Sequence, residues 1–378
     1  MGLVRVTRTV WATSAAAILA GALIACRDRP APAKPARATA AARNAALAAA
    51  RVWSPPRVPP GSVDFSVNTP GPGAFDANAD VDCTFALEPT GGSTPKFHCT
   101  LANGDRVKVK YGEVIPNSEV PAEVAATRLL AALGFPTDRM NRVHSVRCRG
   151  CPPLPQQALQ CLEKREPALA CLQGAAPDRI VTFGHAAIER PLEGNRIEAS
   201  KNQGWSWYEL EKIDPKAGGS SRAEVDALRL MAILLAHWDN KGANQKLLCP
   251  PGAARPDGSC RAPVAAIADP GSTFGPMSVD LVSWKQVPMW IDPATCRVGM
   301  KTLPFAGATF QDVQISEDGR QLALRLLRPL TPEQLNTLFA ASGVTEFPHI
   351  AAAARDPRNW TEAFLDKVHQ IAAAGPCP

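Results

Sequence analysis

Three features that mark nucleic-acid-binding and repeat proteins are missing from this sequence. The formal net charge of +6 is spread thinly over 378 residues, and no run of like charge indicates a surface for DNA or RNA. Aromatic residues make up only 6% of the chain, which argues against a platform on which bases stack. No internal repeat is evident. We therefore expect no nucleic-acid partner, and the length suits one large domain or two lobes.

The first 26 residues are typical of a bacterial lipoprotein signal peptide. Arg5 and Arg8 precede an apolar, alanine-rich stretch from Val10 to Ala25, which ends in Leu-Ile-Ala-Cys26. This ending resembles a lipobox, in which the cysteine is acylated and becomes the mature N-terminus, so Cys26 is the expected lipidation site. An ordinary signal peptide or a short membrane anchor is the alternative. Because Arg27 is not the aspartate that retains such proteins in the inner membrane, the resemblance implies the periplasmic face of the outer membrane or the cell surface.

Residues 27–60 consist mainly of alanine, proline and basic residues. This composition predicts a spacer between the lipid anchor and the folded domain. An isolated alanine-rich helix over residues 40–50 is the alternative, with proline a few residues beyond each end.

Ten cysteines remain when Cys26 is set aside. An even number in an exported protein favours a disulfide framework. Cys83 with Cys99, and Cys249 with Cys260, each bracket a predicted hairpin and are natural partners. For the cluster between them, a zinc site with four thiolate ligands is the alternative that the oxidising compartment disfavours. Its ligands would be Cys148, Cys151, Cys161 and Cys171.

Alternating side chains predict three antiparallel strands over residues 82–87, 96–101 and 106–111. A helix over residues 118–134 follows, with a serine cap, acidic residues in the first turn and a terminal glycine. Residues 136–204 are rich in proline, glycine and cysteine, and we expect an irregular insertion pinned by disulfides.

The second half of the chain is predicted to be mainly helical. Ser221-Arg-Ala-Glu224 is a capping box that opens a helix with an apolar stripe. Short strands are expected at residues 245–248 and 263–267, and further helices at 332–341 and 361–374. Four tryptophans are expected to pack in the interior: Trp205, Trp207, Trp284 and Trp290.

The helix that begins at the capping box runs directly into a polar cluster, AHWDNKGANQKLL at residues 236–248. Its spacing is H-x-D-x-K-x-x-N, formed by His237, Asp239, Lys241 and Asn244. Further on, Asp269-Pro-Gly271 follows the predicted strand pair. These motifs resemble the catalytic loop and the metal-binding Asp-Phe-Gly of protein kinases. The likeness is greatest to the atypical secreted and spore-coat kinases and to the phosphoinositide kinases.

The resemblance implies an α+β fold with two lobes. A small antiparallel sheet and the helix after it would form an N-lobe over residues 61–135, and residues 205–378 would form a mainly helical C-lobe. The cysteine-rich insertion, 136–204, would lie between them. The order of strands, lysine, helix glutamate, catalytic loop and metal-binding aspartate is the kinase order, and it extends over residues 81–275.

The resemblance also implies a division of roles at the active site. Asp239 would be the base that accepts the proton of an attacking hydroxyl, and Lys241 would neutralise the transferring phosphoryl group. Asn244 and Asp269 would bind Mg²⁺ or Mn²⁺ together with an ATP-like nucleotide, since these ions prefer hard oxygen ligands.

A lysine on the third strand would contact the other phosphates. Lys110 is the candidate, with Lys108 as its rival on the same side of the strand. Its partner would be Glu123, or Glu119 one turn earlier, because the spacing alone does not choose between them. The Gly91-Gly92 turn could lie over the phosphates through its backbone N–H groups.

Two residues depart from the family pattern. Trp238 stands where many kinases carry an arginine that senses a phosphorylated activation loop, and Pro270 replaces the usual phenylalanine. Taken singly, the loop residues could also form the polar end of a helix. The sequence therefore predicts an exported enzyme that transfers a phosphoryl or nucleotidyl group to a hydroxyl of a protein or small envelope molecule. A catalytically inactive lipoprotein that binds or scaffolds envelope partners is the alternative.

Overall fold

The computed structural model describes seven stretches of the chain. They are residues 37–92, 94–112, 118–199, 203–276, 279–303, 307–347 and 349–378. The predicted signal peptide, including Cys26, lies outside them. Within these stretches, no helix has both the length and the apolar character needed to cross a bilayer.

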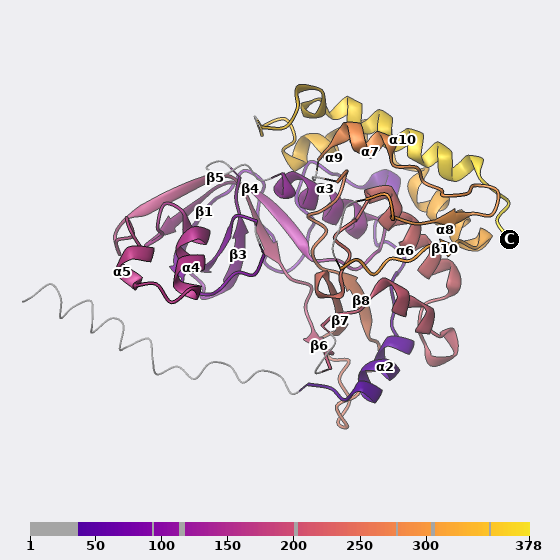
Figure 1. The fold of residues 1–378 in the computed structure, drawn as a ribbon, viewed down its shortest axis with the longest axis horizontal. Helices are drawn as coiled ribbons and strands as arrows, with labels where there is room; N and C mark the ends of the chain where they lie inside the picture. Colours follow the sequence, from indigo (N-terminus) through magenta and orange to yellow (C-terminus); the bar gives the residue numbers. More distant parts are fainter. Residues whose placement is uncertain are drawn as a thin grey trace, which may run out of the picture. The chain divides into compact units, whose positions relative to one another are not determined.

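Five strands close into a small barrel in the order β1-β2-β3-β5-β4 (Figure 1). They are β1 (Asp80–Ala86), β2 (Lys96–Leu101), β3 (Arg106–Lys110), β4 (Arg139–Arg149) and β5 (Ile180–Arg190). Neighbouring strands run antiparallel, except that β1 and β4 pair in parallel and so close the barrel. The three predicted strands are confirmed, but the expectation of a purely antiparallel sheet is wrong.

The prediction of an irregular insertion over residues 136–204 is also wrong, because β4 and β5 belong to this range and complete the barrel. The chain between these two strands leaves the sheet and carries two short helices beside the barrel, α4 (Pro155–Glu163) and α5 (Ala168–Cys171) (Figure 1). The high content of proline, glycine and cysteine in this excursion obscured the strands on either side. The barrel therefore extends beyond residue 135.

Aromatic rings fill the barrel. Phe97, Tyr111 and Phe183 meet in its interior with ring centroids between 4.8 and 5.7 Å apart. This is the smaller of two hydrophobic clusters, and burial of such rings stabilises the barrel as a unit.

Helix α3 (Glu119–Ala132) follows the barrel's third strand, as predicted, and it is buried on almost every side. The predicted serine cap is wrong, because Ser118 already has helical backbone angles and its side chain makes no capping hydrogen bond. It packs against β4 and against α9 (Pro332–Ser342). Arg128, which is 2% exposed, donates from Nη1 to the carbonyl of Phe65 at 3.0 Å and from Nη2 to Oδ1 of Asn68 at 2.5 Å. Asn68 donates in turn to a carbonyl of β4 at 2.7 Å. The helix is thus fixed by polar bonds as well as by apolar packing.

The remaining helices form the larger hydrophobic cluster with α3. They are α6 (Arg222–Leu235), α7 (Leu281–Gln286), α8 (Glu317–Leu327), α9 and α10 (Pro357–Ala373). Both bonds of the predicted capping box of α6 are present, between Ser221 and Glu224. The four tryptophans expected in the interior are all buried.

Two small sheets accompany these helices. One is three-stranded, in the order β6-β7-β8, and contains β6 (Asn195–Arg196), β7 (Gln245–Cys249) and β8 (Val264–Ile267). The other pairs β9 (Arg297–Val298) with β10 (Val313–Gln314). The two predicted strands after the catalytic-loop motif are therefore confirmed as β7 and β8.

The predicted spacer over residues 27–60 is wrong for its second half. Helix α2 (Ala40–Ala48) packs against the helical part, and Arg43 forms a buried ion pair with Glu209 at 2.7 Å. Arg51 then exchanges backbone hydrogen bonds with the strand β8 region. The alternative of an alanine-rich helix was correct, and tertiary contacts stabilise it because so short a helix is marginal alone.

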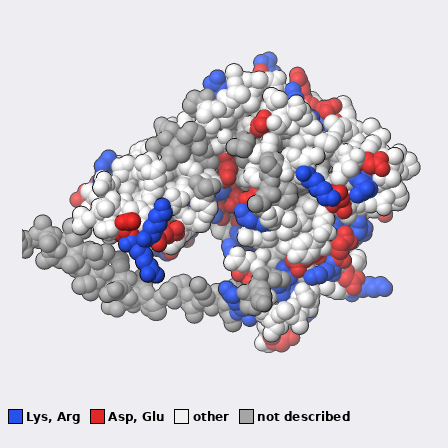
Figure 2. All heavy atoms as spheres, viewed as in Figure 1, with Lys and Arg blue, Asp and Glu red and all other residues white. Residues whose placement is uncertain are grey.

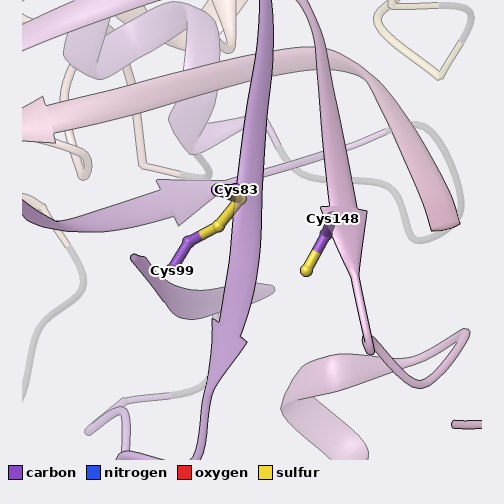
Figure 3. A group of neighbouring side chains, drawn as sticks. All are labelled: Cys83, Cys99 and Cys148. Carbon is purple, nitrogen blue, oxygen red and sulfur yellow. A yellow bond between two sulfur atoms is a disulfide. The ribbon is translucent and has the colours of Figure 1, made fainter. Parts of the chain in front are cut away.

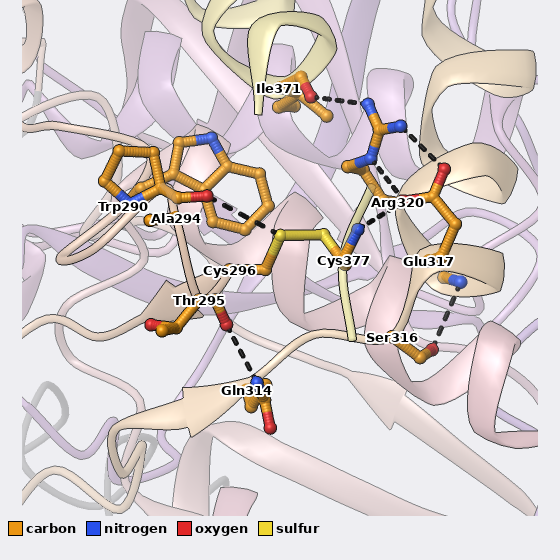
Figure 4. The surroundings of a disulfide bond; sticks show 12 residues. Trp290, Ala294, Thr295, Cys296, Gln314, Ser316, Glu317, Arg320, Ile371 and Cys377 are labelled. Carbon is orange, nitrogen blue, oxygen red and sulfur yellow. Dashed lines mark hydrogen bonds and ion pairs between the residues drawn. A yellow bond between two sulfur atoms is a disulfide. The ribbon is translucent and has the colours of Figure 1, made fainter. Parts of the chain in front are cut away.

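All ten cysteines in the described stretches form disulfides. The pairs are Cys83–Cys99, Cys148–Cys151, Cys161–Cys171, Cys249–Cys260 and Cys296–Cys377. Figure 4 shows the last of these beside the first turn of α8, where Cys377 N donates to Glu317 Oε2 at 2.9 Å and Glu317 pairs with Arg320. The two predicted hairpin disulfides are confirmed.

Candidate active site

A buried ion pair joins the barrel to α3. Lys110 ends β3, and its Nζ lies 2.6 Å from Oε2 of Glu123 in the second turn of α3. Neither side chain is exposed to solvent. The lysine and the helix glutamate expected from the kinase order therefore meet.

The structure decides between the rival residues. Lys108 forms an ion pair with Glu189, its cross-strand neighbour on β5. Glu119 accepts a hydrogen bond from Thr94 Oγ1 at 2.5 Å. Lys108 is therefore not the lysine that Glu123 holds, and its role in nucleotide binding stays a prediction.

Asp269 lies two residues beyond β8 and contacts the same lysine. Lys110 Nζ is 3.3 Å from Asp269 Oδ1, and the Asp269 side chain remains 36% exposed. Burial raises the pKa of Asp269, but the positive charges of Lys110, Lys108 and Lys96 outweigh it and hold the pKa well below its usual range. Asp269 is therefore an ionised carboxylate with access to solvent, as a metal ligand must be.

The charges around Lys110 favour its protonated form. Burial lowers the pKa of Lys110, but the carboxyl groups of Asp269 and Glu123 outweigh burial and keep the pKa well above its usual value. Burial raises the pKa of Glu123 to about 8, even though Lys110 opposes the shift. Lys110 is thus a fixed cation at the centre of the site.

The catalytic-loop motif begins where α6 ends. Ala236 takes a left-handed conformation with φ of 49°, and the N–H of His237 donates to the carbonyl of Ala232 at 2.9 Å. Two further bonds hold the start of the loop against residues 272–274: Trp238 N donates to the Ser272 carbonyl, and Phe274 N to the Leu235 carbonyl. The segment after Asp269 therefore lies alongside the loop.

Contacts within the loop connect Asp239 to Asp269. Lys241 Nζ lies 2.8 Å from Asp239 Oδ2, and Asn244 Nδ2 donates to the Asp239 carbonyl at 2.7 Å. The Asn244 carbonyl accepts from the backbone N–H of Ala268 and of Asp269, at 3.0 and 3.1 Å. All the predicted catalytic and metal-binding residues are thereby linked by direct contacts.

Asn244 and Asp269 present suitable atoms to a cation. The Asn244 amide nitrogen is used as a donor, so its Oδ1 would be the atom that binds a metal. Asp269 uses Oδ1 to accept from Lys110, which leaves Oδ2. These hard oxygens fit Mg²⁺ or Mn²⁺, which need only a few protein ligands beside phosphate and water.

His237 has a structural place in the loop. It is fully buried, with Nε2 3.2 Å from Nε2 of Gln245. Burial lowers the pKa of His237 to about 4, although Asp269 and Asp239 act in the opposite direction. The ring is therefore neutral at physiological pH, and its nitrogens are directed toward the protein interior rather than toward a substrate.

Asn240 is a residue of the loop that sequence reasoning missed. It is fully buried, and its Oδ1 accepts from the N–H of Thr309 and of Phe310, at 2.8 and 3.0 Å. Its Nδ2 donates to the His237 carbonyl at 3.0 Å. Asn240 thus positions the loop, and no local pattern distinguishes it from the solvated asparagine of an ordinary turn.

The residues that depart from the kinase pattern pack locally. Trp238 is half-buried, and its Nε1 donates to the Gly275 carbonyl at 3.1 Å. The Pro270 carbonyl accepts from Thr273 Oγ1 at 2.9 Å. Both residues therefore support the loop and the segment beside it.

The cysteine cluster of the barrel does not form a metal site. The sulfurs of Cys83, Cys99 and Cys148 lie within 4.8 Å of one another. Figure 3 shows these three side chains as neighbours. Cys83 is bonded to Cys99, however, and Cys148 to Cys151, so these sulfurs are not thiolates. The other two proposed zinc ligands are also bonded to each other. The disulfide prediction is confirmed and the zinc alternative is wrong.

A cavity of about 370 Å³ lies beside the loop at Gly242 and Ala243. Arg43, Glu209 and Tyr208 contribute to its wall from α2 and the turn before α6. The described residues that line this cavity do not include the predicted catalytic or metal-binding residues. The cavity is therefore separate from the site built around Lys110.

Basic and acidic side chains are interspersed on the face drawn in Figure 2. This matches the thin spread of charge along the sequence.

No protein-family model matches the sequence, and no curated protein sequence matches it either. Among solved structures, the chain is similar to the proinflammatory kinase CtkA of Helicobacter pylori at 10% identity, over 78% of this chain and 96% of that chain, with a TM-score of 0.43. It is also similar to a Golgi casein kinase solved with Mn/ADP bound, at 13% identity, over 78% of this chain and 74% of that chain, with a TM-score of 0.34. Because both TM-scores are below 0.5, the case for the site rests on the contacts within this chain.

Proposed function

We propose that this protein is a kinase-like phosphotransferase that moves a phosphoryl group from a metal-bound nucleotide to a hydroxyl. The observation that carries the proposal is an unbroken series of contacts. It runs from Glu123 through Lys110 and Asp269 to Asn244 and Asp239. These residues come from β3, α3, the loop after α6 and the end of β8. If they served only the stability of the fold, the presence of each one at the site would need its own reason.

The residues can supply what phosphoryl transfer requires, which is positioning and neutralisation of charge. Asp239 accepts the proton of the attacking hydroxyl as its oxygen bonds to the phosphorus. The bond from phosphorus to the bridging oxygen breaks, and its electron pair leaves with the nucleoside diphosphate. Lys241 places a cation next to the base. Mg²⁺ or Mn²⁺ held by Asn244 and Asp269 would neutralise phosphate charge when bound.

Nucleotide binding can be tested by thermal unfolding with and without a non-hydrolysable ATP analogue and Mn²⁺. A ligand at 100 times its Kd stabilises a protein by ~2.7 kcal/mol, so we expect the midpoint of the wild type to rise by several degrees. Asp269→Ala should abolish the rise, whereas Asp292→Ala, at a partly exposed turn position that accepts hydrogen bonds only within its own turn, should keep it. If the wild type shows no shift at saturating nucleotide and metal, the proposal fails.

Transfer can be tested with nucleotide labelled on either the α- or the γ-phosphate. Label from the γ-position on an acceptor indicates phosphoryl transfer, and label from the α-position indicates nucleotidyl transfer. Asp239→Asn should lower either activity by about 10²- to 10⁴-fold, the usual contribution of a general base.

An inactive relative that keeps the nucleotide site is the second candidate. One observation that favours it is that Lys241 Nζ contacts the Asp239 carboxylate at 2.8 Å, so the expected base is already paired. A second is that Trp238 and Pro270 stand where protein kinases carry other residues. This candidate predicts that nucleotide stabilises the protein, that no label reaches an acceptor, and that Asp239→Asn leaves binding to envelope partners unchanged.

We further propose that the protein is exported and anchored to a membrane through acylated Cys26. The lipobox-like ending supports this. The five disulfides support export, because disulfides persist in oxidising compartments. The acceptor would then be a protein or small molecule of the cell envelope.

A further inference from the structure

A second lysine lies next to the Lys110 site; its side chain is mostly buried, and its ammonium group has no partner among the described residues. Lys96 is the first residue of β2, and it lies directly opposite Lys110 in the β2–β3 register. Directly opposed residues point to the same face of a sheet, so both side chains approach the same region. Lys96 is 7% exposed.

Lys96 Nζ forms no ion pair and no hydrogen bond with the described residues, whereas the nearby Lys108 and Lys110 are both paired. Lys108 is paired with Glu189, and Lys110 with Glu123 and Asp269. Burial lowers the pKa of Lys96 and the nearby charge of Lys110 acts in the same direction, and together they outweigh the opposing charges of Asp269 and Glu119. An ammonium group that loses water without gaining a partner is costly. Such an arrangement is common where the missing partner is a ligand.

The Gly91-Gly92 turn lies beside this ammonium group. Gly92 has φ of +83°, and a Cβ atom built on it would come within 3.1 Å of Lys96 Nζ. A Cβ built on Gly91 would meet nothing within 4 Å, so the space beside the turn is open there. The carbonyl of Gly92 accepts from Nε2 of Gln156 in α4 at 3.2 Å. The excursion between β4 and β5 therefore holds the turn close to Lys96.

Resting on the proposed function, we propose that Lys96 is a second phosphate-binding lysine, which contacts an oxygen of the nucleotide's phosphate chain beneath the Gly91-Gly92 turn. The ligand class is a nucleoside di- or triphosphate. Phosphate oxygens would give the Lys96 ammonium group the direct anionic partner that the described residues do not provide. Lys110 and Asp269, which face the same region, place the metal-bound end of the chain nearby. Lys96 would therefore contribute to binding of the phosphate chain, and other residues would bind the nucleobase.

The test compares the affinities of AMP, ADP, a non-hydrolysable ATP analogue and inorganic triphosphate, with Mn²⁺, in four proteins. These are the wild type, Lys96→Met, Lys96→Arg and Lys216→Met, the last of which removes one positive charge from an exposed turn. Lys96→Met should weaken ADP, the ATP analogue and triphosphate by about 10-fold or more, while AMP changes by less than about 2-fold. Lys96→Arg should recover most of the loss, and Lys216→Met should match the wild type.

The outcomes separate this inference from the proposed function. If the wild type binds the nucleotides and Lys96→Met binds all of them equally well, the role of Lys96 is overturned and the proposed function stands. If the wild type binds no nucleotide and no triphosphate, both are overturned. The melting temperature without ligand gives an independent check. Lys96→Met should not lower it, because no protein partner is lost, whereas a drop would indicate that Lys96 serves the fold.

Discussion

The Glu123 carboxyl lies against Lys110 without access to solvent, and one turn earlier Glu119 faces Thr94 instead. Glu123→Ala should therefore lower kcat/KM by roughly 10- to 100-fold, since a hydrogen bond to a charged group contributes ~1.5–3 kcal/mol. Glu119→Ala should lower it by less than about 3-fold. Steady-state kinetics on both variants measure the difference, and an equal loss would contradict the assignment of the ion pair.

The buried His237 makes stability depend on pH. Its pKa is about 4 in the folded protein and about 6.5 when unfolded, so between these values the unfolded chain binds more protons. Stability from this group is complete above pH 6.5 and is lost as the pH falls toward 4. Between pH 7 and 4.5 the wild type should lose about 2 kcal/mol more free energy of unfolding than His237→Gln.

Denaturant unfolding at the two pH values measures this difference. The pKa values of Glu123 and Asp138 are raised to about 8 and about 6. These two groups therefore change the unfolding free energy with pH in the direction opposite to His237. Those changes are present in both proteins and cancel in the comparison. Identical pH dependence in wild type and variant would show that His237 is not the group that titrates.

At the scale of elements, the disulfides should differ in how much they stabilise the protein. Cys296 and Cys377 are 81 residues apart in sequence, whereas Cys249 and Cys260 are 11 apart. Removing the first bridge by paired alanine substitutions should cost ~4 kcal/mol of unfolding free energy, and removing the second ~3 kcal/mol, because a longer loop gains more entropy when it is opened. Denaturant midpoints under non-reducing conditions test this order. A larger loss for the second pair would contradict it.

Helices with local signals were predictable from the sequence. The capping box at Ser221 lies where the sequence places it, because a cap is read from residues three apart. Strands β4 and β5 were missed because they pair with each other across an excursion of some thirty residues that carries two helices. Helix α2 was mistaken for a spacer, since its stability comes from Arg43 and Leu47, whose partners lie far away in sequence.

At the scale of the whole molecule, the sequence predicted which residues gather at the site but not which pairs form. Lys108 and Lys110 lie on one side of a strand, and Glu119 and Glu123 on one side of a helix, so periodicity alone gives no choice. The tertiary fold, with its closed barrel and buried helix α3, determines that Lys110 pairs with Glu123. Lys96 and Asn240 were missed because their importance depends on burial, which no motif records.

Export and anchoring through acylated Cys26 predict in which cell fraction of a bacterial host the protein is found. The wild type should fractionate with membranes and take up a fatty-acid label, because several acyl chains bind a bilayer firmly. Cys26→Ser should remain unlabelled, whereas Cys161→Ser, at a disulfide within the fold, should keep the label. Equal labelling of wild type and Cys26→Ser would contradict acylation at this cysteine.

The bonds of Arg128 bear on how such an enzyme could be switched on and off. In protein kinases the helix that carries the glutamate is moved to control activity. Here an outward swing of α3 would break the bonds of Arg128 to Phe65 and Asn68 and separate the helix from α9. On the proposed function, we therefore expect that the active site stays assembled and that the rate is set by the supply of nucleotide and by which acceptors come within reach.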